Sequence, residues 1–297
     1  MLPEDQRMPA ASLTRSHTAN CDHRSNRGFE TWDDGRLLIN PRFAEILQVN
    51  GLTTGAAFLA WRAGETVRHI GARQTTRITL AGPEGPETFF LKRHGPPGWK
   101  ERIVPLLRFA PPILGARNEW DAIQRFGEAG IPTMTPVAYG FQGSHSFLMT
   151  QALPARCNLL ELAEDNARNR PGSRPDDSPQ IEVRTLVPQI AEIARRMHAA
   201  GLHHQDFYLN HMLLCDTDDI RVIDLGRVRQ HRRLGKRWIV KDLAQLDFSA
   251  RSLTCRDRLR FLRLYLGRPL NRGDRSMIRQ IAFKSRRIAA HTAKHKL

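Results

Sequence analysis

The hydrophobic pattern changes character about halfway along the chain. Between residues 65 and 153, short apolar and β-branched runs alternate with turn residues, which predicts strands, one helix and further strands. In the second half, Leu186, Ile190, Ile193 and Met197 fall on one face of a predicted helix. The pattern therefore favours a small sheet-rich lobe followed by a larger helical lobe.

Turn residues divide the first half into its elements. Residues 36–69 resemble a short helical lead-in, and the stretch VRHIGARQTTRITL predicts two strands joined at Gly71. The apolar run TFFLK predicts a third strand that ends at Lys92. Residues 116–129 predict a helix, and the pieces PVAYGFQ and SHSFLMTQAL predict two more strands.

The second half adds a short strand, IRVIDL, and two basic helical stretches, RDRLRFLRLYLG and MIRQIAFKSRRIAAH. Residues 1–35 are polar and rich in Arg, Asn and Ser, which is typical of a disordered extension. The predicted organisation is this extension, an N-lobe over residues 36–153 and a helical C-lobe over residues 154–297.

Composition excludes several classes of protein. The chain of 297 residues is long enough to bury the core of two lobes. Its apolar windows are too short for a transmembrane helix, and the N-terminus lacks the apolar stretch of a secretory signal. Four scattered cysteines without a C-x-x-C spacing argue against zinc and favour a reducing cytosol.

The positive charge is concentrated in the last quarter of the chain. The net charge is +16, and the residues from Arg221 onward contain 22 Lys and Arg against 5 Asp and Glu. This excess can be a set of solvated helix faces. It can also form a surface for an anionic partner, such as a nucleic acid, an acidic membrane or a phosphorylated substrate.

Two acidic residues of the second half suggest chemistry. Asp206 lies in the stretch GLHHQDFYLNHMLL, just past a helix, and Asp224 ends the strand IRVID. Upstream, Lys92 ends a strand and Glu119 sits in the next helix. Phosphoryl transfer needs such a set, because it uses a cation on the phosphates, a carboxylate for the metal and a carboxylate that orients the acceptor hydroxyl.

Each of these residues also has a simpler interpretation. Lys92 can be a solvated strand-edge residue, Glu119 a surface residue of its helix, and Tyr208 a packing residue. The histidines near Asp206 fit no common zinc spacing. We expect His204 to brace the loop through hydrogen bonds to the backbone.

The order Lys92, Glu119, Asp206, Asp224 resembles that of the protein-kinase-like fold, and the closer resemblance is to the lipopolysaccharide core heptose kinase (WaaP-like) family. The matching pieces span roughly residues 65 to 250. They are FFLKRHGPPGWKE, PPILGARNEWDAIQRF, GIPTMTPVAYG, SFLMT, HHQDFYLNHMLL, VIDLGRV and RWIVKDLAQLDFS. The resemblance implies an α+β, two-lobed protein-kinase-like fold with a β-rich N-lobe and a helical C-lobe.

The resemblance also implies a role for each matching residue. Asp206 would be the catalytic aspartate, Lys92 would contact the ATP phosphates, and Glu119 would pair with Lys92. Asp224 would hold Mg²⁺, and Asp242 would brace the catalytic loop. The remaining cofactor contacts would come from Thr150, Gln151, Ala152 and Leu153 as the adenine-binding hinge.

Three features depart from ordinary protein kinases. His211 stands where those enzymes have a metal-binding asparagine, and D-x-Y-x-x-H is the heptose-kinase pattern, so His211 is a second metal candidate. No G-x-G-x-x-G is present. The phosphate-covering turn would begin at Gly71 and use Arg73, Thr75 and Thr76 as donors. Only eighteen positions separate Asp224 from Asp242, which leaves little room for a peptide-docking segment.

That short segment contains seven Lys and Arg, which suggests an anionic acceptor. Tyr208, Arg227 and Arg229 are the candidate substrate contacts. The leading hypothesis is an ATP- and Mg²⁺-dependent kinase that phosphorylates a sugar hydroxyl, a heptose, of the lipopolysaccharide core or another anionic glycan. Two alternatives stay open: a protein Ser/Thr/Tyr kinase or small-molecule phosphotransferase of the same fold, and a basic pseudokinase that binds without turnover.

The expected location is the cytoplasm, at the inner face of the inner membrane, with peripheral contact to acidic lipid. No nucleic-acid partner is expected, and the sequence does not predict an oligomeric state.

Overall fold

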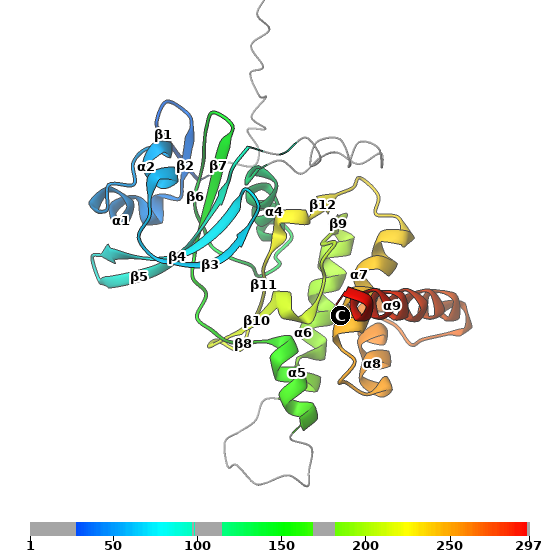
Figure 1. The fold of residues 1–297 in the computed structure, drawn as a ribbon. Coiled ribbons are helices and arrows are strands. Elements are labelled where there is room, and N and C mark those ends of the chain that lie inside the picture. Colours follow the sequence, from blue (N-terminus) through cyan, green and yellow to red (C-terminus); the bar gives the residue numbers. More distant parts are fainter. Residues whose placement is uncertain (1–27, 97, 99–114, 169–181, 296–297) are drawn as a thin grey trace, which may run out of the picture.

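The computed structural model describes residues 28–96, 98, 115–168 and 182–295. Figure 1 shows a sheet-rich part in blue to green and a helical part in green to red. We call them the N-lobe and, from β8 onward, the C-lobe. No helix within the described ranges is both long and apolar enough to cross a membrane.

A seven-stranded antiparallel sheet forms the N-lobe, with the strand order β1-β2-β6-β7-β5-β4-β3. Three helices accompany it, and α4 lies between the sheet and the C-lobe (Figure 1). The strands are β1 (Glu30–Trp32), β2 (Leu37–Ile39), β3 (Glu65–Ile70), β4 (Arg73–Gly82), β5 (Gly85–His94), β6 (Pro136–Gln142) and β7 (His145–Gln151). The helices are α1 (Ala44–Val49), α2 (Gly55–Ala60) and α4 (Arg117–Glu128), with the 3₁₀ turn η1 (Pro41–Phe43).

Buried and more exposed side chains alternate along the central strands, as the sequence predicts. On β4, Ile78 and Leu80 are buried, and on β5, Phe89 and Leu91 are buried, while the residues between them are more exposed. These side chains form one apolar cluster with residues of β2, α1 and α2. Burying an apolar side chain of this size contributes about 1.5–3 kcal/mol, so this cluster fixes the position of β5 and therefore of Lys92.

The C-lobe is built on helices and two small sheets. Its helices are α5 (Leu159–Arg168), α6 (Val183–Ala199), α7 (Lys236–Ser249), α8 (Cys255–Leu266) and α9 (Arg275–His295). Its strands are β8 (Ala155–Asn158), β9 (Leu202–His203), β10 (Met212–Cys215), β11 (Ile220–Val222) and β12 (Arg229–Gln230), with 3₁₀ turns η2 (Leu209–His211), η3 (Leu225–Arg227) and η4 (Arg272–Asp274). The small sheets have the orders β11-β10-β8 and β12-β9.

The predicted apolar stripe of α6 is confirmed. Leu186, Ile190, Ile193 and Met197 are all buried in a cluster that also includes apolar residues of α4 and of the loop around Asp206. At the end of α6, Gly201 adopts φ +74°, and a Cβ there would lie 2.2 Å from the carbonyl oxygen of His231. Only glycine therefore allows the chain to turn into β9 while β12 packs against it.

The start of the N-lobe differs from the prediction. Residues 30–32 were expected in a disordered extension, but they form β1, which pairs with β2. Residues 36–69 contain helices α1 and α2 as expected, yet they also contain β2, and β3 begins at Glu65, two residues before the predicted strand. Residues 1–27 of the predicted extension and residues 169–181 lie outside the described residues.

Candidate active site

A cleft of about 670 Å³ lies between the two lobes. Both lobes supply charged side chains to it. They include Arg68, Arg73 and Lys92 from the sheet, Glu119 from α4, and Asp206, His211, Asp224 and Arg227 from the C-lobe. The cleft therefore collects the four residues that the sequence singled out for phosphoryl transfer.

An ion pair joins β5 to α4 at the back of the cleft. The Nζ atom of Lys92 lies 2.5 Å from Oε1 of Glu119, and their side chains are 19% and 5% exposed. Burial alone lowers the pKa of Lys92, but the carboxylates of Glu119 and Asp224 outweigh it and raise that pKa above its ordinary value. Lys92 is thus a fixed cation, and the predicted Lys92–Glu119 pairing is confirmed.

The loop that carries Asp206 is held from below by α7. Asp242 of α7 is fully buried, and its carboxylate accepts the backbone N–H groups of His204 at 2.8 Å and Gln205 at 3.1 Å. Gln205 adopts φ +71°, a left-handed conformation that non-glycine residues keep only where the surroundings enforce it. The predicted brace by Asp242 is confirmed. It holds Gln205, the residue directly before Asp206, in a strained backbone conformation.

His204 stabilises the same loop as a neutral imidazole. Its Nδ1 accepts the backbone N–H of Asp206 at 3.3 Å, and its Nε2 donates to the carbonyl of Ile223 at 3.2 Å. These two bonds require the Nε2–H tautomer. Complete burial lowers the pKa of His204, which keeps the ring neutral. His204 therefore ties the Asp206 loop to Ile223, between the end of β11 and Asp224, and the expected bracing through hydrogen bonds to the backbone is confirmed.

Asp206 is paired with an arginine. Nη1 of Arg227 donates to both carboxylate oxygens of Asp206, each at 2.9 Å. The side chains are 55% exposed for Arg227 and 20% exposed for Asp206. The sequence offered Arg227 as a substrate contact, and it could not indicate this contact with Asp206.

Asp224 and His211 face each other on the floor of the cleft. Asp224 adopts φ +58°, and its Oδ2 lies 3.8 Å from Nε2 of His211. Burial raises the pKa of Asp224, but Lys92, His211, His204 and Arg68 together outweigh it and lower that pKa. Nδ1 of His211 lies 2.8 Å from the carbonyl oxygen of Asp206, so it must donate there. Nε2 of His211 is then the ring atom that faces Asp224.

An imidazole nitrogen can bind metal, but Mg²⁺ prefers oxygen, so Asp224 is the stronger of the two candidate ligands. Among the described residues no group of three or more His, Cys, Asp and Glu side chains is placed to hold a metal. A cation here would take its other ligands from phosphate oxygens and water, which is the usual arrangement for Mg²⁺ in phosphoryl-transfer enzymes.

Asn118, which the sequence analysis missed, links α4 to the loop after Asp224. Its Nδ2 donates to the carbonyl oxygens of Gly226 at 2.8 Å and Val228 at 3.2 Å. Because Asn118 precedes Glu119, the helix that holds Lys92 is tied directly to the segment that follows Asp224. An asparagine in a helix has no local pattern that reveals a partner 108 positions away.

The predicted nucleotide contacts separate into two groups. Arg73, Thr75, Thr150, Gln151 and Leu153 line the cleft. Gly71 and Ala152 are not among its lining residues, and the N–H of Ala152 donates to Thr88. Thr76 is buried and does not line the cleft, so its hydroxyl, which accepts from Arg93 at 2.9 Å, faces no phosphate in this conformation. The sequence missed Arg68, whose Nη1 lies 3.7 Å from Asp224.

Two of the candidate substrate residues lie outside the lining of the cleft. The hydroxyl of Tyr208 accepts a hydrogen bond from Gln245 at 3.2 Å, and its ring packs edge-on against Phe248. Arg229 belongs to β12, where it pairs with His203 of β9. Of the three candidates, only Arg227 lines the cleft.

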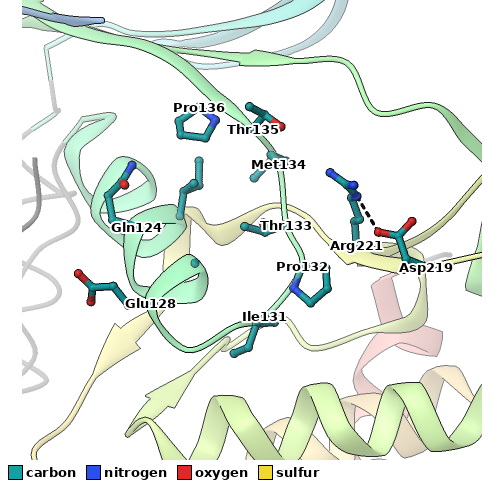
Figure 2. A pocket seen from close by; sticks show the side chains of 12 residues that line it. Gln124, Glu128, Ile131, Pro132, Thr133, Met134, Thr135, Pro136, Asp219 and Arg221 are labelled. Carbon is teal, nitrogen blue, oxygen red and sulfur yellow. Dashed lines mark hydrogen bonds and ion pairs between the residues drawn. The ribbon is translucent and has the colours of Figure 1, made fainter. Parts of the chain in front are cut away.

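A second groove, of about 1000 Å³, runs along the other side of α4 (Figure 2). Some of its polar groups are engaged with the protein, whereas Nε2 of Gln124 is buried without a hydrogen-bond partner among the described residues. Arg221 pairs with Asp219 at 2.9 Å, and the hydroxyl of Thr133 donates to the carbonyl of Val222. This groove lacks the Lys92–Glu119 pair, Asp206 and Asp224, so the cleft between the lobes is the candidate active site.

Comparisons with known proteins agree with this geometry. A family model described as the lipopolysaccharide kinase (Kdo/WaaP) family matches residues 62–265. A lipopolysaccharide core heptose(I) kinase WaaP from Pseudomonas aeruginosa is 42% identical over 221 residues, which cover 70% of this chain and 78% of the relative. The protein with the same name from Escherichia coli K12 is 33% identical over 267 residues, which cover 84% of this chain and 92% of the relative.

A solved structure described as WaaP in complex with acyl carrier protein superposes with a TM-score of 0.64. It is 36% identical to this chain, and the match covers 85% of this chain and 97% of that one. The similarity extends over both lobes and includes the cleft between them.

Proposed function

Because this chain belongs to the lipopolysaccharide kinase (Kdo/WaaP) family, we propose that it is an ATP-dependent kinase that phosphorylates a heptose hydroxyl of the lipopolysaccharide core. One observation carries the proposal. The Lys92–Glu119 pair, Asp206 and Asp224 converge from both lobes on a single cleft.

The chain's own residues divide the reaction between them. Lys92, held by Glu119, offers its ammonium group to the phosphates of ATP. Asp206 accepts a hydrogen bond from the acceptor hydroxyl and takes its proton as the hydroxyl oxygen bonds to the γ-phosphorus. The bond from that phosphorus to the bridging oxygen breaks, and ADP leaves with this oxygen.

Asp224 and His211 are the residues that would hold Mg²⁺. The ion, when bound, neutralises charge on the phosphates. ATP with Mg²⁺ is expected to raise the melting temperature of the protein, and ATP with a chelator is expected to raise it less. Asp224→Asn should remove this difference. An equal shift in wild type with and without metal would contradict the metal assignment.

The nucleotide is expected to lie under the β3–β4 hairpin. Arg68, Arg73 and Thr75 line the roof of the cleft there and can donate to phosphate oxygens, while Thr150, Gln151 and Leu153 line the side where the lobes join. This arrangement replaces the glycine-rich loop of protein kinases with arginine and threonine side chains.

Transfer of labelled γ-phosphate to purified lipid A–core tests the function. Wild type should label the acceptor, and Asp206→Ala should lose about 10²–10⁴-fold in rate, which is the usual contribution of a catalytic acid–base group. Asp216→Ala is the matched control because Asp216 lies in the exposed β10–β11 turn. Absence of transfer by wild type, or full transfer by Asp206→Ala, contradicts the proposal.

The same assay separates the alternatives. Labelling of a peptide or a small sugar in preference to lipid A–core would favour a protein kinase or a small-molecule phosphotransferase. Nucleotide binding without any labelling would favour a pseudokinase.

We further propose a cytoplasmic location at the inner face of the inner membrane, with peripheral contact through α9. Its outer side carries Arg279, Arg286 and Arg287 beside the exposed ring of Phe283. Basic side chains next to an aromatic ring favour an anionic lipid surface. Flotation with anionic and neutral vesicles tests this contact, and equal binding to both would contradict it.

Acyl carrier protein is a second proposed partner. A relative's structure contains it, and an acidic protein suits the basic C-terminal quarter of this chain. Size-exclusion chromatography should show a complex that weakens at high salt and with Arg279→Glu/Arg286→Glu. Arg77→Glu, on exposed β4, is the control and should leave binding unchanged. A complex insensitive to both salt and charge reversal would contradict the binding of acyl carrier protein to this basic surface.

A further inference from the structure

Arg227 occupies the position where an acceptor hydroxyl must bind. Its Nη1 donates to both oxygens of Asp206 at 2.9 Å. A cation bonded to both oxygens weakens the carboxylate as an acceptor for a third group, and it fills the space in front of Asp206. Asp206 cannot take a proton from the acceptor efficiently until Arg227 moves.

The backbone around Arg227 is fixed, while its side chain is not. The carbonyl of Arg227 accepts a hydrogen bond from Gln205 Nε2 at 2.7 Å, and the carbonyls on either side accept from Asn118. The side chain itself is 55% exposed. Exposed ion pairs contribute only about 0–1 kcal/mol, so the guanidinium can leave Asp206 at low cost without moving the loop.

Two other basic residues lie close to Arg227. Burial together with the charge of Arg227 lowers the pKa of both Arg229 and Lys241. Positive charge is therefore concentrated around Arg227, and the carboxylates of Asp206 and Asp242 both act on Lys241. An anion that enters here relieves repulsion among three cations and competes directly with Asp206 for Arg227.

We propose that Arg227 is a specificity-determining residue that senses an anionic group on the acceptor, either a phosphate or a sugar carboxylate, and releases Asp206 when it binds that group. This inference rests on the proposed kinase function. A neutral acceptor leaves Arg227 on Asp206 and reacts slowly. An anionic acceptor supplies the competing partner and is oriented at the same time, with its hydroxyl toward Asp206.

We call this contact of Arg227 with Asp206 the gate. The gate should also control the reaction of ATP with water. Water can replace the acceptor hydroxyl: its oxygen bonds to the γ-phosphorus, the bond to the bridging oxygen of ADP breaks, and one water proton goes to Asp206. With Arg227 in place this hydrolysis is suppressed. Without it, acceptor-independent ATP hydrolysis should increase.

The test compares wild type with Arg227→Gln, Arg227→Lys and Arg268→Gln. Arg268 forms an arginine–aspartate pair with Asp274 at 2.7 Å that is remote in sequence from the cleft residues, so it controls for the loss of one charge and one such pair. The acceptors are lipid A–core in three forms: native, dephosphorylated, and carboxyl-reduced.

Wild type should lose about 10- to 100-fold in kcat/KM on the form that lacks the sensed anion, which corresponds to one charge-assisted hydrogen bond. Arg227→Gln should lose this discrimination, and Arg227→Lys should retain part of it because a single donor atom makes the contact. Slow reaction of the dephosphorylated form identifies a phosphate as the sensed group, and slow reaction of the carboxyl-reduced form identifies a carboxylate. Equal use of all three forms by wild type, or undiminished discrimination by Arg227→Gln, overturns the proposal.

Acceptor-free hydrolysis gives a separate measurement. Arg227→Gln should hydrolyse ATP several-fold faster than wild type and Arg268→Gln, and Arg227→Gln/Asp206→Asn should return to the wild-type rate or below. An unchanged rate in Arg227→Gln overturns the gate. Absence of transfer to every acceptor by wild type would instead contradict the kinase function, while the hydrolysis comparison still decides the gate.

Discussion

Two ion pairs face the same cleft, and they differ in burial. Lys92 and Glu119 come from β5 and α4, and their side chains are 19% and 5% exposed. Asp206 and Arg227 come from the loop after β9 and from η3, and Arg227 is 55% exposed. The first pair contacts the region expected for ATP, and the second contacts the region expected for the acceptor.

This difference in burial separates a permanent contact from an exchangeable one. A buried pair is strongly destabilised when one partner is lost, because the other charge then has no solvent and no partner. An exposed pair can exchange its partner for water or a ligand at little cost. The nucleotide side of the cleft is therefore set in advance, whereas the acceptor side can be rearranged by the substrate.

The largest effect should come from breaking the buried pair. Glu119→Gln leaves the Lys92 ammonium without its carboxylate and should lower the free energy of unfolding by about 3–5 kcal/mol, as well as the transfer rate. Lys92→Met/Glu119→Leu should regain most of this stability while staying inactive, because no buried charge remains. Urea denaturation measures both variants. A double variant as unstable as Glu119→Gln would show that packing, and not charge, dominates here.

The next largest effect should come from the brace under the catalytic loop. Asp242→Asn keeps one acceptor oxygen for the N–H groups of His204 and Gln205 but loses the charge beside His198. We expect a loss of about 2–3 kcal/mol in unfolding free energy and a reduced kcat with little change in KM for ATP. Denaturation and steady-state kinetics check this. A raised KM for ATP at unchanged kcat would argue that Asp242 acts on the nucleotide side.

Acid should destabilise the protein between about pH 6.5 and pH 4, because two histidines resist protonation in the folded state. Burial lowers the pKa of His203 to about 4, so the unfolded chain binds a proton below pH 6.5 that the folded chain does not take up until about pH 4. Stability should therefore fall as pH drops through this window, by about 1.4 kcal/mol per pH unit for each such proton. His94, with its pKa lowered to about 4, adds to the slope. His203→Gln should reduce the slope, and an unchanged slope would exclude His203 as a source.

The smallest effect should come from breaking the exposed pair. Arg227→Gln should change the free energy of unfolding by less than about 1 kcal/mol, even though it changes acceptor selectivity. Its effect on stability should fall further at high salt, since the pair is accessible to solvent. Parallel urea titrations of Arg227→Gln and Glu119→Gln make the comparison. A loss in Arg227→Gln as large as in Glu119→Gln would contradict the distinction between the two pairs.

Much of the architecture was predictable because it depends on local patterns. The helix at 116–129, the long strands that contain Thr75 and Lys92, and the stripe of α6 all have the length and periodicity that a sequence displays. The family predicted from the ordered motifs is confirmed by a match over residues 62–265. The two-lobed fold is confirmed by the solved relative.

The errors fall where an element depends on distant partners. Strands β1 and β2 have three residues each, which is too short to show alternation. They form because β2 pairs with β6, with Leu38 opposite Tyr139. Ala152 and Thr76 have suitable positions in the sequence, but an N–H or a hydroxyl that already has a protein partner offers no simple contact to ATP.

The sequence by itself determined which chemistry is available, because the residue types and their order specify a cation for phosphates, a metal-binding carboxylate and a proton acceptor. Only the tertiary structure decided how those groups are controlled. The contacts of Arg227 with Asp206 and of Asn118 with Gly226 join residues 21 and 108 positions apart. The first contact depends on how η3 folds back onto the loop after β9, and the second on how the lobes pack. Side-chain hydrogen bonds across such distances have no periodic pattern in the chain.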